Sequence, residues 1–490
     1  MQGFYLNEDN SNFFASFPES DMTLEGVRRF IRGYAGRQVG AVVMSVNSQR
    51  ASYNSKVIEP IWAGVTEDAN GKMSFMGAEL SRGSRWIHNA KKLHDDGIDV
   101  YKEWIEELHA AGKEAWISCR MNDLHNVDDE KSFMHDKLWR EHPEFRRAMY
   151  IGDWFGRAFD FAHAEVRNNK LALLTEQLDR YDADGFELDW TRFPAFFKPG
   201  CEMRDAHLIT EMLRELRDIA HEHEVKRGHK IKIGARVLSS IEDSLRFGLD
   251  VVAWVNEGLV DSLTVGNFWP TINSDIPFET WRTVFGNKIE LNAGLELTAL
   301  PFSNVPEGKL MPLTKEMLAA CSSEYLYRGA DHIYLFNLMN GGTGMHDNEN
   351  FRIALDSCGL AETAYGLPRR HVITFSTLRP QGIREGYSLP RRLEGWQSFR
   401  LNVGGGTQGR EAFIVFGLDS EPKDGLHVQC YLNAEMCENA PVSSMRFPSL
   451  VKGCFCAKAP VGALHDGDNV IDIKVDGAEL TANWCEIFIP

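Results

Sequence analysis

The segment from Tyr181 to Pro194, YDADGFELDWTRFP, carries the densest set of side chains able to do acid–base chemistry. Glu187 and Asp189 are separated by one residue, so a strand here would point both carboxylates to one face. Two buried carboxylates are costly unless a cation compensates them, and Arg192 is the expected partner. The pair is therefore either a catalytic pair or a set of ion-pair anchors beneath a site, and this segment leaves both interpretations open.

A second candidate segment is RMNDLH, from Arg120 to His125. Histidine exchanges protons near neutral pH because its unperturbed pKa is ~6.5, so His125 is a candidate proton donor. Either Asp123 or Asp128 could hold its other ring nitrogen. A lone histidine in a loop is usually exposed to solvent and has no functional role, but the neighbouring Arg120 favours a functional site here.

The third candidate is the run Asn7-Glu8-Asp9-Asn10. A carboxylate in this run could activate a water molecule. The alternative is a purely structural role, in which Asp and Asn cap a turn. His221, Glu222 and His223 could suggest a metal, but they end a predicted helix among charged residues. We therefore expect no metal and no cofactor, and the sequence contains no G-x-S-x-G or H-E-x-x-H motif.

The elements that position these side chains are short β-type runs alternating with amphipathic helices. Helical periodicity is clear at 100–111, 166–181 and 208–221, and residues 49–97 form a long insertion. Repeated strand–helix units predict a closed (β/α)8 barrel, and the alternative is an open doubly wound sheet, which would normally carry a Gly-rich loop after its first strand. The predicted strands are 3–8, 39–46, 114–119, 185–189, 232–238, 262–265, 289–295 and 332–336.

Active sites of such barrels lie at the carboxyl ends of the strands. Polar residues end seven of the eight predicted strands, and Glu296 follows the seventh. A barrel with a purely structural role has no reason to build such a polar mouth. The residues that we expect to bind a ligand there are Asn7, Arg120, Asp189, Arg192, Asn267, Asn337 and Asn340.

The pattern changes after about residue 365, which predicts a barrel domain over 1–365 and an accessory domain over 366–490. The second part is split by Gly, Asp and Pro into short runs, a pattern typical of an antiparallel β-sandwich. Its predicted strands are 371–378, 398–403, 412–418, 426–432, 470–475 and 484–489.

Composition and charge restrict the kinds of partner that the protein is expected to bind. The 490-residue chain has a net charge of −17, which disfavours nucleic acids and anionic membrane surfaces. A small anionic ligand would need a local cluster of arginines. The nine cysteines fit no zinc spacing and are expected to be mostly free thiols, which favours a reducing compartment such as the cytoplasm. The first twelve residues have no signal-peptide pattern.

With these residues in view, the chain resembles the family-10-like glycosyl hydrolase barrels through YDADGFELDWTRFP and the preceding AHAEVR. Within that group it is most similar to glycoside hydrolase family 156, the inverting exo-sialidases. The likeness rests on an acidic residue at the end of the first strand, the spacing of Arg120 and His125, and the positions of Arg192 and Asn337. It covers the barrel and the β domain.

The resemblance implies that His125 is the Brønsted acid and that Asp9 is the base. Glu8 also ends the first strand, and we prefer Asp9 because the family base is an aspartate. Arg120, Arg192 and Asn337 would hold the sialic acid, whose carboxylate suits bidentate arginine contacts. The implied ligands are sialylated glycans or other small glycosides, and a homodimer is a further expectation.

Two alternatives stay open. A retaining glycosidase would use Asp189 or Glu187 as acid/base and Glu296 as nucleophile, with the two carboxyl groups ~5 to 5.5 Å apart. A non-catalytic glycan-binding protein is the other, because a fold alone never proves activity.

Overall fold

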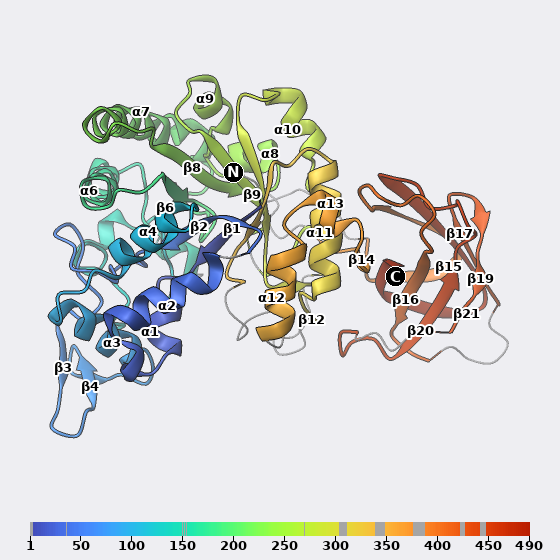
Figure 1. Ribbon diagram of the computed structural model, residues 1–490, viewed down its shortest axis with the longest axis horizontal. Coiled ribbons are helices and arrows are strands. Elements are labelled where there is room, and N and C mark those ends of the chain that lie inside the picture. Colours follow the sequence, from blue (N-terminus) through green and yellow to red (C-terminus); the bar gives the residue numbers. More distant parts are fainter. Residues whose placement is uncertain are drawn as a thin grey trace. The chain divides into compact units, whose positions relative to one another are not determined.

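The computed structural model describes residues 3–35, 37–148, 150, 152, 154–268, 270–302, 311–338, 348–375, 388–421, 427–441 and 447–490. Its central feature is a closed barrel of eight strands, which follow one another around the barrel in chain order (Figure 1). All eight predicted barrel strands are confirmed. They are β1 (Phe4–Glu8), β2 (Val39–Ser45), β6 (Glu114–Arg120), β7 (Gly185–Asp189), β8 (Lys232–Leu238), β9 (Ser262–Gly266), β10 (Glu290–Leu295) and β13 (His332–Leu335).

The interior of the barrel is packed with side chains rather than hollow. Trp116 on β6 is buried, and its ring lies over Gly185 of β7 and Gly234 of β8. A Cβ atom at Gly185 would lie 2.4 Å from that ring, and one at Gly234 would lie 2.8 Å from it. The two glycines therefore leave room for the indole, which fills the barrel as side chains do in small barrels.

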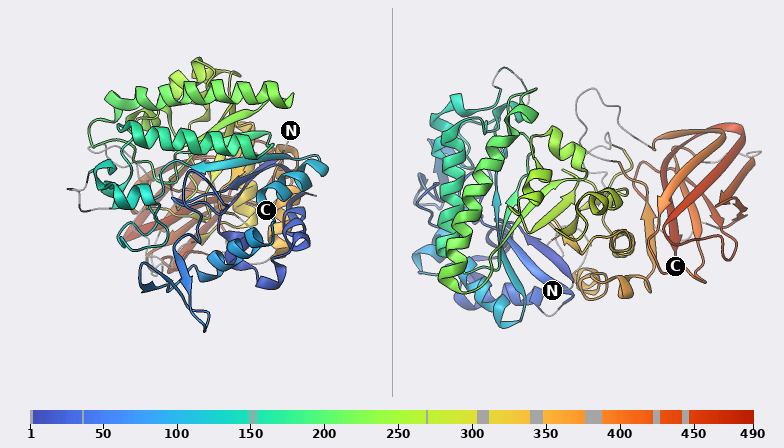
Figure 2. Two further views of the ribbon diagram at one scale, coloured as in Figure 1. Left: turned by 90° about the vertical axis from the view of Figure 1, so that its left-hand side faces the viewer. Right: turned by 90° about the horizontal axis from the view of Figure 1, so that it is seen from above.

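Helices surround the strands, and the three periodic segments form helices as predicted. These are α4 (Val100–Ala110), α6 (Ala164–Arg180) and α7 (Glu202–Arg227), of which α6 and α7 run side by side outside the strands (Figure 2). The other helices of eight or more residues are α2 (Leu24–Ala35), α3 (Ser84–Asp95), α10 (Phe278–Phe285), α11 (Lys315–Tyr327) and α12 (Asn348–Ser357). The shorter ones are α1 (Asn12–Ser16), α5 (Lys137–Glu141), α8 (Ile241–Arg246), α9 (Val251–Asn256) and α13 (Ala361–Ala364).

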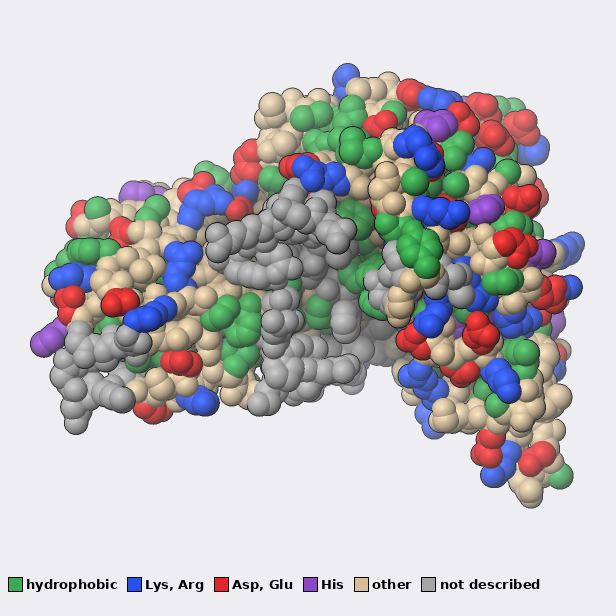
Figure 3. All heavy atoms as spheres, turned by 180° about the vertical axis from the view of Figure 1, so that it is seen from behind, with side chains coloured by type: hydrophobic (Ala, Val, Ile, Leu, Met, Phe, Trp, Pro, Cys, Tyr) green, Lys and Arg blue, Asp and Glu red, His purple; other side chains and the backbone are tan. Residues whose placement is uncertain are grey.

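The insertion predicted at 49–97 has more regular structure than expected. It contains a small antiparallel sheet of β3 (Val65–Glu67), β4 (Met73–Phe75) and β5 (Ala78–Glu79), followed by α3. Acidic and basic side chains are intermixed over the described surface seen in Figure 3, including this projecting sheet. Helix α3 was missed although Trp86, Ile87, Ala90 and Leu93 bury one helical face.

The C-terminal part forms an antiparallel sheet, as the strand pattern predicted. Its longest strand, β21 (Asp468–Ile489), pairs with β14 (Arg369–Val372), β15 (Arg391–Asn402), β16 (Phe413–Leu418) and β17 (His427–Leu432). The prediction split β21 into two strands and missed β20 (Gly453–Lys458). Part of the predicted strand 371–378 lies outside the described residues. The remaining strands are β11 (Thr298–Ala299), β12 (Met311–Pro312), β18 (Glu435–Met436) and β19 (Glu438–Asn439).

Two compact units divide the chain, one built mainly from Tyr5–Thr264 and the other mainly from Val265–Asn287 and Leu291–Pro490. This division does not follow the boundary predicted near residue 365, which stays a prediction. All nine cysteines are free. No helix in the described part of the chain is long and apolar enough to cross a membrane.

Candidate active site

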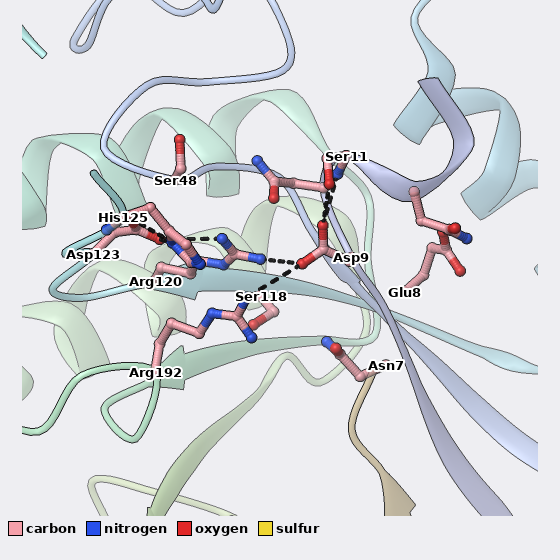
Figure 4. A network of polar contacts seen from close by, with 12 residues as sticks. Asn7, Glu8, Asp9, Ser11, Ser48, Ser118, Arg120, Asp123, His125 and Arg192 are labelled. Atoms are coloured by element: carbon pink, nitrogen blue, oxygen red, sulfur yellow. Dashed lines mark hydrogen bonds and ion pairs between the residues drawn. The ribbon is translucent and has the colours of Figure 1, made fainter. Parts of the chain in front are cut away.

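Five ionisable side chains of the first unit gather at the carboxyl ends of β1, β6 and β7 (Figure 4). Asp9 directly follows β1, and Arg120 is the last residue of β6. Asp123 and His125 lie in the loop after β6, and Arg192 lies just after β7. This is the end of the barrel at which catalytic groups of this fold are found.

Asp9 is held from both of its carboxylate oxygens. The backbone N–H of Ser11 donates to Oδ1 at 2.9 Å, and the Ser11 hydroxyl donates to the same atom at 2.6 Å. Oδ2 forms an ion pair with Arg120 and lies 3.8 Å from Nη2 of Arg192. Burial alone would raise the pKa of Asp9, but the two guanidinium charges and the Ser11 hydrogen bonds outweigh it and hold this pKa well below its usual range.

Asp123 joins the arginine to the histidine. One of its oxygens lies 3.1 Å from Nη1 of Arg120, and the other lies 2.9 Å from Nδ1 of His125. Burial opposes ionisation, yet the charges of His125 and Arg120 keep the pKa of Asp123 well below its usual range. Of the two acids proposed to hold His125, Asp123 does so, while Asp128 pairs with Arg157.

The histidine ring keeps one nitrogen for a ligand. Nδ1 of His125 is engaged by Asp123, and no residue in the described part of the chain contacts its Nε2 through a hydrogen bond. The side chain is 37% exposed, so a ligand can approach this nitrogen. The carboxylate therefore fixes the ring while the second nitrogen faces solvent.

The structure separates Glu8 from Asp9. The side chain of Glu8 points away from the arginines and accepts hydrogen bonds from Asn12 at 2.8 Å and from the Tyr34 hydroxyl at 3.0 Å (Figure 4). Complete burial raises the pKa of Glu8 to about 8, although these two hydrogen bonds oppose the rise. Glu8 is thus mostly a neutral acid at pH 7, outside the cluster of ionised groups.

Glu187 and Asp189 are both buried on β7, and the charge of Asp189 favours the cationic form of the expected partner, Arg192. Ser118 on β6 donates to Glu187 at 2.8 Å, and Arg236 on β8 donates to Asp189 at 2.9 Å. Asp189 and Arg236 are direct register partners on neighbouring strands, which explains the pairing. Arg192 also lies 3.8 Å from Oδ2 of Asp9.

The other predicted ligand-binding residues are placed individually. Asn7 is buried and donates to the carbonyl of Val43 at 3.3 Å. Asn267 donates to two carbonyl groups, those of Thr271 and Phe375, at 3.1 Å each. Three residues follow strand ends of the second unit: Glu296 follows β10 and is buried, Asn337 follows β13 with φ of 53°, and Asn340 lies outside the described residues.

Asn122 has a role that the sequence did not reveal. Its buried amide donates to the carbonyls of Phe159 and Ala195 at 3.1 and 2.7 Å, and it accepts from the N–H of Phe159 at 3.2 Å. It thereby ties the loop after β6 to two other loops. Its place between Arg120 and Asp123 was the available signal, but an amide's partners cannot be read from sequence.

No protein-family model matches the sequence, and no curated protein matches it. Among solved structures, the chain is similar to alpha-L-fucosidase isoenzyme 2 from Paenibacillus thiaminolyticus, with 12% identity, a TM-score of 0.43, and coverage of 73% of this chain and 48% of that one. A chitinase from Chromobacterium violaceum gives 10% identity, a TM-score of 0.37, and coverage of 74% of this chain and 99% of the chitinase. The GH30 xylanase C catalytic domain from Talaromyces cellulolyticus gives 10% identity, a TM-score of 0.34, and coverage of 97% of each chain. The chain spans about half the length of the fucosidase, and these low scores add nothing about activity.

Proposed function

We propose that this protein is a glycoside hydrolase that removes terminal sialic acid by an inverting single displacement. One observation carries the proposal. The Asp9 carboxylate meets the guanidinium groups of Arg120 and Arg192 beside a histidine whose Nδ1 is held by Asp123. A base, a cationic anion-binding pair and an oriented acid thus lie together at the mouth of the barrel.

The two arginines would allow this acidic protein to bind an anionic substrate. Sialic acid carries a carboxylate on its anomeric carbon, and guanidinium groups bind carboxylates through paired hydrogen bonds. A bound carboxylate would share the charges of Arg120 and Arg192 with Asp9. Because these charges hold the pKa of Asp9 low, substrate binding would raise that pKa and make Asp9 a better base.

The chemistry then follows from the two remaining groups. Protonated His125 donates from Nε2 to the glycosidic oxygen as the bond from that oxygen to the anomeric carbon breaks. Asp9 accepts a proton from a water molecule whose oxygen forms the new bond on the opposite face of the sugar. A water between Asp9 and the anionic centre also avoids direct repulsion between two carboxylates. The released sugar would have inverted configuration.

The test is to follow hydrolysis of an α-linked sialoside by proton NMR from the first minutes. Early β-anomer supports the proposal, whereas early α-anomer means retention and favours Glu296 with Asp189 or Glu187. Asp9→Ala and His125→Ala should each lower kcat by at least ~10²-fold. Glu8→Gln is the matched control, because Glu8 adjoins Asp9 but lies outside the cluster, and it should retain the rate.

Three outcomes would overturn the proposal or the roles it assigns. Release of no sugar from any sialoside would redirect the assay to neutral and uronic-acid glycosides, and binding without turnover would favour a glycan-binding protein. Near-wild-type rates in both the Asp9 and the His125 variants would refute their assignment as base and acid.

A further inference from the structure

A row of aromatic rings leads away from His125. The ring of Phe193 meets the imidazole edge to face, with centroids 5.1 Å apart and planes at 84°. Trp154 meets Phe193 in the same way at 5.3 Å and 87°, and Phe155 lies 4.6 Å from Trp154. Phe193 is buried, whereas Trp154 is 37% exposed. The row therefore includes an indole, that of Trp154, which presents part of its surface to solvent.

Backbone hydrogen bonds join the described residues on the two sides of this indole. Trp154 lies in a loop whose base is closed by hydrogen bonds from the N–H of Arg147 to Ala158 and from the N–H of Ala148 to Gly156. Asn122, which lies three residues before His125, forms hydrogen bonds with Phe159 next to these contacts. The segment that follows Trp154 is therefore tied to the loop that carries the proposed acid.

The expected direction of the leaving group matches this row. A general acid must reach the glycosidic oxygen, so the departing sugar lies on the side of His125. Because Asp123 holds Nδ1, the ring orientation is set and Nε2 is the nitrogen that serves this oxygen. A large aromatic side chain that is partly exposed is well suited to apolar contact with a ligand.

Charge favours a neutral ligand at this place. Arg157 ends the short 3₁₀ turn Trp154–Arg157 and forms an ion pair with Asp128. The cation nearest to Trp154 in the sequence therefore already has an acidic partner. A second carboxylate would find no comparable partner on this turn.

We infer that Trp154, backed by Phe193, is the platform that binds the leaving-group sugar, a neutral pyranose stacked by its apolar face on the indole. The inference rests on the proposed function for its placement beside the acid. Trp154 would act as a specificity-determining residue for the part of the substrate that departs.

Two substrates separate this role from a structural one. The α-methyl sialoside has no leaving-group sugar, whereas sialyllactose has a galactose in that position. Trp154→Ala should lower kcat/KM for sialyllactose about tenfold and change the value for the methyl sialoside less than twofold. Trp154→Phe should recover most of the loss. Trp396 is an exposed tryptophan of the C-terminal sheet, and Trp396→Ala is the matched control that should change neither value. Equal losses on both substrates in Trp154→Ala would overturn the inference.

A binding measurement keeps the two proposals apart. Saturation-transfer NMR with lactose alone should show contact with the wild-type protein and a strong reduction in Trp154→Ala. If the wild type cleaves no sialoside but lactose contact depends on Trp154, the sialidase proposal fails and the platform stands. Absent lactose contact in the wild type, or contact unchanged in Trp154→Ala, would refute the platform even if sialosides are cleaved.

Discussion

Replacing Asp123 by Asn tests how the candidate acid is controlled. Asp123 is almost completely buried and lies between Nδ1 of His125 and Nη1 of Arg120. The substitution keeps the shape but removes the negative charge that contacts both His125 and Arg120. We expect kcat to fall, because His125 loses the charged partner that orients its ring.

The magnitude follows from the 2.9 Å separation between Asp123 and the His125 nitrogen. Coulomb attraction at that distance is about 6 kcal/mol at an effective dielectric constant of 20 and about 1.4 kcal/mol in water. Because the histidine is 37% exposed, solvent screening reduces the larger value. We take about 2 to 3 kcal/mol, which corresponds to a loss of roughly 30- to 150-fold in kcat at pH 7.

The assay is the pH dependence of kcat for the wild type and for Asp123→Asn. Without the carboxylate that holds Nδ1 of His125, kcat should be lower than in the wild type across the profile. Asp128→Asn is the matched control, because Asp128 is exposed, pairs with Arg157 and should leave the profile unchanged. An unchanged profile in Asp123→Asn, or an altered one in Asp128→Asn, would refute the assignment.

Three further predictions concern single residues. Glu8 keeps its proton up to about pH 8 in the folded state but only to ~4.3 when unfolded, so it destabilises the fold increasingly as the pH rises between these values. The Tm of Glu8→Gln relative to that of the wild type should therefore rise over this pH range and then level off. A Tm difference that stays constant with pH would contradict this prediction. Asn122→Ala leaves the buried backbone groups of Phe159 and Ala195 unpaired and should cost about 1 to 3 kcal/mol in denaturant unfolding; an unchanged midpoint would show that Asn122 is dispensable. Glu296→Gln should retain most sialoside hydrolysis, since abolished activity would favour the retaining alternative.

The barrel strands were predictable because each is a short apolar run bounded by polar residues or glycine. The run FYL before Asn7 is apolar on both faces, so nothing in it says which face Glu8 or Asp9 shares. The structure separates the two acids because successive strand side chains alternate. Strand positions were therefore accessible from sequence, but the orientation of residues at the strand ends was not.

Partners across strands and loops could not be predicted in the same way. The pairing of Asp189 with Arg236 depends on the register of β7 and β8, which a single sequence does not encode visibly. The choice of Asp123 over Asp128 depends on the path of one loop. Strand β20 was missed because its sequence GCFCAK combines a glycine, two cysteines and a lysine in a pattern with no clear alternation.

Strand β21 has a consequence for synthesis on the ribosome. It pairs with β14, β15, β16 and β17, all of which precede it in the chain. These strands leave the exit tunnel before their shared partner is made, with backbone groups and apolar faces that await pairing. The nascent sheet is therefore most exposed to aggregation while β21 is still being translated, and slow translation or a truncated message at this point would be expected to recruit chaperones.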